Sequence, residues 1–340
     1  MPTSAKILAI EYHLPNGVLS NQALAEVFHE WSADKIFEKT GIYERHIAGE
    51  GETAADLAYF AANKLFDSNN IEKSGIDFLI FCSQTPDHFL PSSACLLQDR
   101  LNLPTSCAAL DINIGCSGYV YGLSLCKGLI ETGIAKNVLL LTSDTYSKLI
   151  HPQDRSVRTL FGDGAAATLI SSVESAHSKL GPFVLGTDGA GAKNLIVPSG
   201  GFRERHQMGV AAEYTDGSGN TRSKMNLFMD GPEVMNFTLS SVPKVFRQLL
   251  ESAGKTMDDI DHVIFHQANQ FMLEALRKKI KIPPEKFIIE MDTVGNTVSS
   301  TIPIAIARAK EKGQVRSGDV AVLLGFGVGY SWGGTIVELF

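Results

Sequence analysis

The feature that most restricts the fold of this chain is an internal repeat. Three short apolar segments of its first half reappear in the second half, in the same order and at nearly constant spacing. The pairs are 76–81 with 260–265, 111–116 with 292–296, and 137–141 with 319–323. Each segment is rich in β-branched and aliphatic residues, which is typical of buried strands. The repeat therefore indicates two copies of one structural unit.

Helices are expected between these strands, and the alternation determines the fold class. The predicted helices cover about 53–66, 116–132, 233–253, 270–279 and 299–312. Strands that alternate with helices of this length imply right-handed crossovers and largely buried sheets. We therefore expect an α/β protein, either a duplicated five-layer αβαβα sandwich or two packed domains, with halves at 1–178 and 179–340. An ordinary doubly wound fold with accidental similarity is the alternative. Residues 186–222 are rich in glycine and lack periodicity, so we expect a long surface excursion there.

Composition excludes several functional classes. Hydrophobic residues make up 44% of the 340 positions, and no apolar run approaches the roughly 18 residues that a membrane span needs. The net charge of −7 disfavours non-specific binding to nucleic acid or to an anionic membrane. Five cysteines without a CxxC pair argue against a disulfide framework and a zinc site, and residues 1–20 lack the features of a signal peptide. We expect a cytoplasmic protein with reduced thiols and no bound metal.

Cys116 is the candidate nucleophile. A predicted strand runs through Gly115-Cys116-Ser117-Gly118 directly into an apolar helix, and the glycines permit a tight turn and close approach of a substrate. At a helix N-terminus the free amides and the dipole favour the thiolate, so we expect a lowered pKa for Cys116. The alternative is a small buried hydrophobic residue, which we expect for the four other cysteines. These are Cys82, Cys95, Cys107 and Cys126.

Two polar residues follow related strands of the second half. His266 comes directly after the apolar run 262–265, at the strand end where ligands of α/β folds collect. Asn296 occupies the elbow that the repeat relates to Cys116. Taken singly, the histidine could be a structural residue and the asparagine a helix N-cap. Together the three residues form a Cys/His/Asn set at three strand ends.

Several motifs, in order and at suitable spacing, make the sequence resemble β-ketoacyl-acyl carrier protein synthase III of the thiolase superfamily. They are TGIYERH at 40–46, DINIGCSG at 111–118, LFGDGAA at 160–166, HQAN at 266–269, GNT at 295–297 and GFGVG at 325–329. The resemblance implies a dimeric, thiolase-like fold and a Claisen condensation. In it a primer acyl-CoA acylates Cys116, and malonyl-acyl carrier protein is decarboxylated to supply the carbon nucleophile. No cofactor is implied besides these substrates.

The resemblance also assigns the surroundings of the nucleophile. His266 and Asn296 are expected to hold the enolate oxygen, and the backbone of Gly327-Val328-Gly329 is expected to help form an oxyanion hole. Phe161 and Phe326 are expected to line the acyl pocket and exclude water. Phe89 and Leu90 are expected to cross to the partner subunit and close its pocket, and local burial within one chain is the alternative.

Two sets of cations are assigned to the substrates by resemblance. Lys35, Lys39 and Arg155 correspond to positions that bind CoA, although Lys35 stands where the family has an aromatic residue, with Trp31 one turn earlier. A second set follows His266 and is expected to dock the acidic carrier protein, with 277 and 281 on one face of a helix. It comprises Arg277, Lys278, Lys279 and Lys281.

Other functions remain open at this point. The acyl group could pass from Cys116 to an alcohol or amine without carbon–carbon bond formation, or the chain could be a non-catalytic partner of a condensing enzyme. Retention of His266 and Asn296 favours condensation, and retention of Cys116 disfavours the partner role. Biosynthetic thiolases need a second reactive cysteine near the C-terminus, and every cysteine here lies between 82 and 126.

Overall fold

The computed structural model, which describes residues 2–205 and 212–340, contains two large sheets, and four strands of each lie in equivalent order. The first sheet has the order β1-β7-β6-β4-β5. Its strands are β1 (Thr3–His13), β4 (Phe78–Cys82), β5 (Ala108–Ile112), β6 (Asn137–Asp144) and β7 (Gly164–Glu174). The second sheet, followed from its β8 edge, has the order β8-β15-β14-β13. Its strands are β8 (Leu180–Thr187), β13 (His262–Phe265), β14 (Val320–Gly327) and β15 (Ser331–Glu338). The shared order confirms the internal repeat.

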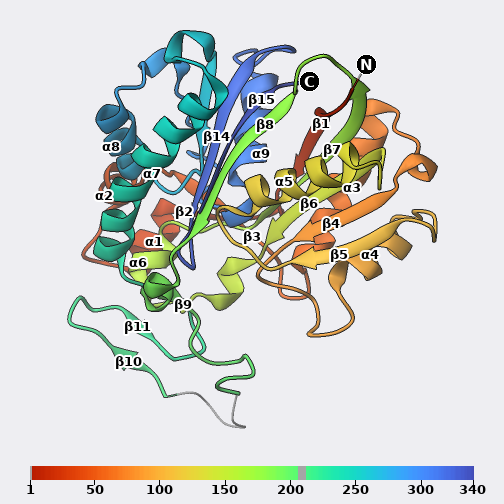
Figure 1. Cartoon of the computed structure of the whole chain (residues 1–340). Helices are drawn as coiled ribbons and strands as arrows, with labels where there is room; N and C mark the ends of the chain where they lie inside the picture. Colours follow the sequence, from red (N-terminus) through yellow and green to blue (C-terminus); the bar gives the residue numbers. More distant parts are fainter. Residues whose placement is uncertain (1, 206–211) are drawn as a thin grey trace.

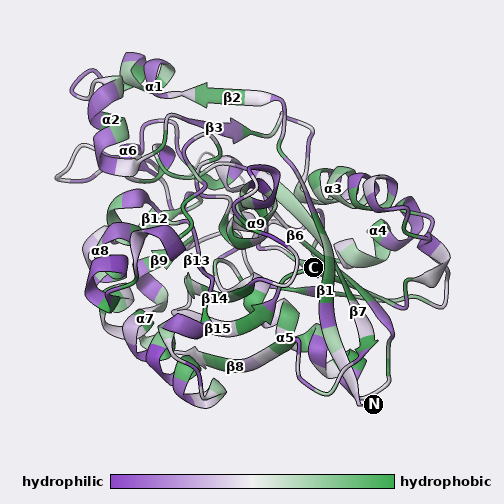
Figure 2. Cartoon of the chain, turned by 90° about the horizontal axis from the view of Figure 1, so that it is seen from above, coloured by the Kyte–Doolittle hydropathy of each residue, from purple (hydrophilic) through white to green (hydrophobic). Residues whose placement is uncertain are grey.

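Helices cover the sheets on both faces and complete five layers (Figure 1). The outer layer of the first sheet is formed by α3 (Ala54–Asn69) and α4 (Ser93–Arg100). Between the sheets lie α5 (Gly118–Glu131) and α9 (Thr301–Glu311), which share one apolar core with both sheets. The outer layer of the second sheet is formed by α7 (Gly231–Ala253) and α8 (Gln270–Ile280). Figure 2 shows the strands as largely apolar and the outer helices as richer in hydrophilic residues, which is the pattern that a layered core requires.

Local sequence explains how these helices begin and pack. Thr53 and Asp56 form a reciprocal capping box at the start of α3, and alanines on its inner face, such as Ala58 and Ala62, allow close packing on the sheet. Asp230 caps α7, and Asn269 caps α8, each accepting a hydrogen bond from a backbone N–H of the first turn. The five predicted helices are therefore all present, with small differences at their ends.

One predicted strand is wrong. The segment 292–294 forms a turn, and the place of β5 in the second sheet is taken by a single bridge between Phe287 and Val263. The Asp292 side chain accepts a hydrogen bond from the N–H of Thr293 at 3.0 Å, and Gly295 has a φ of 77°. Turn chemistry thus outweighs the strand preference of the repeat. In the first half the predicted strand at 111–114 ends already at Ile112.

Smaller elements cap the strand ends where the two sheets meet. They are β2 (Gly17–Ser20), β3 (Glu44–Ile47), α1 (Asn21–Val27), α2 (Ala33–Thr40) and α6 (Arg155–Arg158). Arg45 is fully buried among them and donates to the side chain of Asn21 and to the carbonyls of Leu19 and Thr159. This guanidinium joins these elements to the C-terminal end of α6, since Thr159 directly follows that helix. In addition, α2 packs against α8.

The expected excursion at 186–222 contains short elements, and 206–211 lie outside the described residues. The elements in and beside it are β9 (Leu195–Ile196), β10 (Tyr214–Thr215), β11 (Thr221–Arg222) and β12 (Phe228–Met229). The β10–β11 hairpin projects beyond the layered body (Figure 1) and is anchored by a buried ion pair between Arg222 and Asp154 at 2.6 Å.

Two further points concern the whole chain. We propose that its halves divide between the end of β7 at Glu174 and the start of β8 at Leu180, beside the expected boundary at 178. Within residues 2–205 and 212–340, no helix is long and apolar enough to cross a membrane.

Candidate active site

Cys116, His266 and Asn296 line one cavity of about 130 Å³. Its remaining wall is largely apolar and includes Leu160, Phe161, Leu195, Met229, Val234, Met235, Met272 and Phe326. The three polar residues lie after β5, after β13 and at the second elbow, so the duplicated fold brings together positions far apart in the sequence. The Cys/His/Asn set expected from the sequence therefore lines one common cavity.

Cys116 lies at the elbow between β5 and α5, and its side chain is buried. The elbow is tight, since the N–H of Gly118 donates to the carbonyl of Gly115 at 2.7 Å. β14 passes directly beside it: a Cβ added at Gly327 would lie 2.8 Å from the sulfur. The backbone N–H groups of Val328 and of Cys116 itself are directed at the sulfur. Glycine at 327 thus lets two backbone donors converge on the nucleophile.

The expectation of a lowered pKa for Cys116 is wrong. Burial, reinforced by the nearby carboxylate of Asp144, raises the pKa of the Cys116 thiol to about 12. The physical reason is that no cation lies beside the sulfur within the described residues to offset desolvation. In the free protein the thiol is therefore neutral and needs a base when it reacts. Among the other cysteines, Cys82, Cys107 and Cys126 are buried as expected, whereas Cys95 is exposed.

His266 is held at the end of β13 by a backbone hydrogen bond and by two contacts of its ring. Its backbone N–H donates to the carbonyl of Leu324, and the ring lies edge-on to Phe326 with centroids 5.6 Å apart. Burial lowers the pKa of His266 to about 3, so the imidazole is neutral near pH 7. Its Nδ1 lies 2.7 Å from the hydroxyl of Thr301.

Asn296 is fixed by backbone and side-chain hydrogen bonds. Its N–H donates to the carbonyl of Leu160, and its own carbonyl accepts from Gly162, each at about 3 Å. Its side-chain oxygen accepts from the N–H of Val298 at 3.0 Å, which leaves the amide NH₂ as the group that can face a ligand. The NH₂ makes one long contact of 3.5 Å, to the carbonyl of Ala268.

The aromatic and loop residues predicted for the acyl pocket separate into two groups. Phe161 and Phe326 line the cavity, together with Gly327, whereas Val328 lies behind the elbow against Gly115. Phe89 and Leu90 do not reach it: they are 78% and 81% exposed. Because both side chains are exposed, the local-burial alternative is wrong for this chain alone, although Phe89 contacts Phe202 with ring centroids 5.5 Å apart.

Sequence reasoning missed three residues beside the nucleophile. Tyr146 is buried in the same cluster as Cys116 and donates to the side-chain oxygen of Gln84 at 2.5 Å. Asp144 is fully buried at the end of β6, and burial raises its pKa to about 7. It accepts from the N–H of Gln84 at 2.7 Å and from the hydroxyl of Ser299 at 2.6 Å. Only the pairing of β6 with β4 and the packing of the halves bring these residues together.

The cations predicted for CoA gather around an aromatic ring. Lys35, Lys39 and Arg155 all approach the ring of Trp31, at 5.5, 5.2 and 4.7 Å from its centroid. Lys35 and Lys39 also line a surface hollow with Phe271, which is 67% exposed at the start of α8. The aromatic ring beside these three cations is thus that of Trp31, one turn before Lys35.

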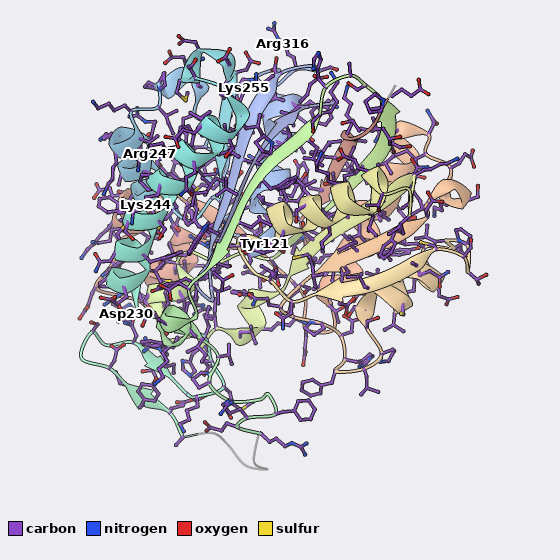
Figure 3. The ribbon with its side chains drawn as sticks, viewed as in Figure 1. Tyr121, Asp230, Lys244, Arg247, Lys255 and Arg316 are labelled. Carbon is purple, nitrogen blue, oxygen red and sulfur yellow. The ribbon has the colours of Figure 1, made fainter. Side chains whose placement is uncertain are left out.

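The predicted basic stripe on α8 is narrower than expected. Arg277 pairs with Glu274 at 2.8 Å, and Lys281 ends the helix in a left-handed conformation, so these two do not share a helical face. Lys278 and Lys279 are exposed, and across the described ranges neither makes an ion pair. On α7, which packs against α8, Lys244 and Arg247 add exposed cations on the outward side (Figure 3).

In the described part of the chain, no group of three or more His, Cys, Asp and Glu side chains is arranged to hold a metal ion. The site is instead defined by one thiol, one neutral imidazole and one amide in an apolar cavity. A duplicated αβαβα sandwich that gathers these groups has the architecture of the thiolase-like fold.

Comparison with known proteins gives the family. The model of 3-oxoacyl-[acyl-carrier-protein] synthase III matches residues 110–189, and the model of its C-terminal part matches 250–339. The β-ketoacyl-[acyl-carrier-protein] synthase III of Caldanaerobacter subterraneus is 36% identical over 98% of both chains. A crystal structure of a 3-oxoacyl-(acyl-carrier-protein) synthase III is 54% identical, with a TM-score of 0.97 over 99% of this chain and 100% of that one. The synthase of Burkholderia xenovorans is 38% identical, with a TM-score of 0.88 over 99% of this chain and 94% of that one. The chain therefore belongs to the 3-oxoacyl-acyl carrier protein synthase III family, and the thiolase-like fold is confirmed.

Proposed function

We propose that this protein condenses a primer acyl-CoA with malonyl-acyl carrier protein, through an acyl-Cys116 intermediate, in fatty acid or related secondary-metabolite biosynthesis. The observation that carries the proposal is the single cavity shared by Cys116, His266 and Asn296. A thioester chemistry with an enolate intermediate needs a sulfur nucleophile and neutral hydrogen-bond donors in a dry site, and these residues supply both.

In the first half-reaction Cys116 attacks the thioester carbonyl of the acyl-CoA. Because its thiol is neutral in the free protein, the proton leaves as the sulfur attacks, and neutral His266 accepts it at Nε2 and returns it to the departing CoA thiolate. The N–H groups of Cys116 and Val328, which converge on the sulfur, are suited to hold the developing oxyanion.

In the second half-reaction malonyl-acyl carrier protein loses CO₂ and becomes an enolate. Its oxygen is held by Nε2–H of His266 and by the NH₂ of Asn296, while C2 attacks the acyl-Cys116 carbonyl. The Cys116 sulfur leaves as the thiolate and takes up one proton from solvent, and a β-ketoacyl-carrier protein is released. Phe161 and Phe326 keep water from the acyl intermediate, and Tyr146 packs in the same buried cluster as Cys116.

The substrates are expected to reach the cavity from the surface between α2 and α8. The Trp31 ring with Lys35, Lys39 and Arg155 suits the adenine and phosphates of CoA, through stacking and ionic contacts. Lys278 and Lys279 are the expected docking cations for the carrier protein, with a smaller part for Arg277 and Lys281.

We expect a cytoplasmic homodimer. Two large apolar side chains, Phe89 and Leu90, are exposed on one loop, and an exposed apolar pair of this kind favours a protein partner. In a dimer this loop would close the acyl pocket of the other subunit.

Intact mass spectrometry with a panel of acyl-CoAs tests the function. The expected result is one acyl adduct on the wild-type protein, none on C116S, and formation of β-ketoacyl-carrier protein with release of CO₂ once malonyl-carrier protein is added. H266A and N296A are expected to acylate to some extent and to lose decarboxylation by about 100-fold, the scale of one oxyanion donor. Transfer of the acyl group to an alcohol or amine without CO₂ release would replace condensation by simple acyl transfer. Absence of any adduct would leave the non-catalytic role.

A further inference from the structure

Three consecutive hydroxyl residues follow the Asn296 elbow and attach it to the rest of the site. The hydroxyl of Ser299 donates to Asp144 at 2.6 Å, and that of Ser300 donates to the carbonyl of Thr142 at 2.9 Å. These two bonds fix the elbow to the end of β6. The third hydroxyl, on Thr301, faces His266 instead.

The Thr301 hydroxyl lies between two acceptors. It is 2.7 Å from Nδ1 of His266 and 3.1 Å from the carbonyl oxygen of Val298, and Thr301 is only 3% exposed. The Val298 carbonyl is itself within hydrogen-bonding reach of the His266 ring. A hydroxyl carries one proton, so it can donate to only one of these two acceptors at a time.

This choice decides which nitrogen of His266 carries the proton. The buried ring is neutral, so it has one N–H. If Thr301 donates to Val298, then Nδ1 carries the proton, and Nε2 faces the cavity as an acceptor. If Thr301 donates to Nδ1, then Nε2 carries the proton and faces the cavity as a donor.

We propose that Thr301 is a positioning residue: by donating to Nδ1 it gives His266 the Nε2–H form. A hydrogen bond to the Val298 carbonyl would instead favour the Nδ1–H form. The inference deepens the proposed function, on which it rests. The two half-reactions need opposite forms, since Nε2 must accept the thiol proton of Cys116 and must later donate to the enolate oxygen. Interconversion moves one proton off Nδ1 and one onto Nε2 by exchange with water, with no net change of charge. Rotation of one hydroxyl thus lets one ring serve both steps.

Replacing Thr301 by valine tests this role, because valine keeps the shape and removes the hydroxyl. In T301V the hydroxyl that can donate to Nδ1 is gone, whereas the hydrogen bond between the ring and the Val298 backbone is kept, so the Nδ1–H form is favoured. We expect decarboxylation of malonyl-carrier protein to fall by about 100-fold, and acylation of Cys116 by acyl-CoA to be retained. T301S keeps the hydroxyl and is the matched control, with both half-reactions near wild type.

A spectroscopic readout separates this inference from the proposed function. Nitrogen-15 spectra of the full-length protein labelled at histidine report which ring nitrogen is protonated, with His266 assigned by H266Q. The expected result is Nε2–H in the wild type and in T301S, and Nδ1–H in T301V; T301A carries the same expectation if valine impairs folding. An Nε2–H form in T301V or T301A, or equal loss of both half-reactions, would overturn the inference. Failure of the wild type to decarboxylate malonyl-carrier protein would instead count against the proposed function, and the spectra would still test Thr301.

Discussion

A single methyl group at Gly325 should displace the nucleophile. Gly325 lies in β14 where this strand crosses the Cys116 elbow, and an added Cβ would lie 2.7 Å from the carbonyl oxygen of Cys116 and 2.7 Å from Cα of Ser117. Heavy atoms pack favourably at roughly 3.5 Å or more, so the two segments must separate by about 0.8 Å. Both contacted atoms belong to the backbone, so no side-chain rotation can relieve the clash.

The expected cost of G325A follows from this displacement. Overpacking of this kind destabilises a protein by about 1–3 kcal/mol. A shift of the reacting sulfur by close to 1 Å costs about 100-fold in rate, because attack needs close alignment with the carbonyl. We therefore expect a lower melting temperature and acylation of Cys116 slowed by about 100-fold.

Rapid-quench mass spectrometry measures the acylation rate, and G128A is the matched control. Gly128 lies within α5, exposed, with no heavy atom within 4 Å of an added Cβ. Alanine there should stabilise the helix by about 0.5–1 kcal/mol and leave the rate unchanged. Wild-type acylation in G325A, with an unchanged melting temperature, would refute the close approach of β14 to the elbow.

Four further predictions concern the thiol, its neighbour Asp144, the carrier protein and the primer. Because the pKa of Cys116 is about 12, its alkylation by iodoacetamide should rise about tenfold per pH unit from pH 7 to 9. A plateau below pH 8 would contradict this. D144N removes a charge that raises the pKa of Cys116, so alkylation at pH 8 should be faster, and an equal rate would exclude the coupling. The double change K278E/K279E should raise KM for malonyl-carrier protein at low salt without slowing acylation by acyl-CoA. L90A should admit longer primers in the mass assay if the loop closes the partner's pocket, and an unchanged chain-length profile would count against it.

A matched charge reversal separates docking from general electrostatics. Lys244 and Arg247 are also exposed cations, on the outward side of α7 (Figure 3). K244E/R247E changes the net charge by the same amount as K278E/K279E. A smaller rise in KM is expected for the α7 pair if docking is local to α8, and an equal rise would show that only the overall field matters.

The repeat and the helices were predictable because they depend on local patterns of apolar residues. The elbow of Cys116 was predictable for a similar reason, since Gly115 and Gly118 flank it in sequence. The pKa of Cys116 was not, because burial and the charge of Asp144 come from the sheets and from a strand that follows α5. A helix N-terminus argues for a low pKa only where the thiol remains solvated or near a cation.

The second elbow shows a different limit of sequence reasoning. The repeat predicted a strand before Asn296, but the Asp292 side chain and the positive φ of Gly295 form a turn instead. The gathering of three cations around Trp31 was also not predictable, because Arg155 comes from α6, far away in sequence. The turn thus comes from local side-chain and backbone chemistry that overrides the strand pattern, whereas the approach of Arg155 to Trp31 depends on elements distant in sequence.

The attachment of the second elbow makes the two halves of the chain interdependent. Asp144 and Thr142 belong to β6 of the first half, and the hydroxyls that they accept come from Ser299 and Ser300 of the second. The Cys116 elbow is linked in the same way, since the hydroxyls of Ser117 and Ser331 lie 2.7 Å apart. The hydrogen bonds that fix each elbow thus join the first half to the second half. The cavity is also lined by residues of both halves, so neither half by itself can form it. Duplication thus supplied two equivalent elbows, and hydrogen bonds across the halves keep the thiol of one and the amide of the other in the wall of one cavity.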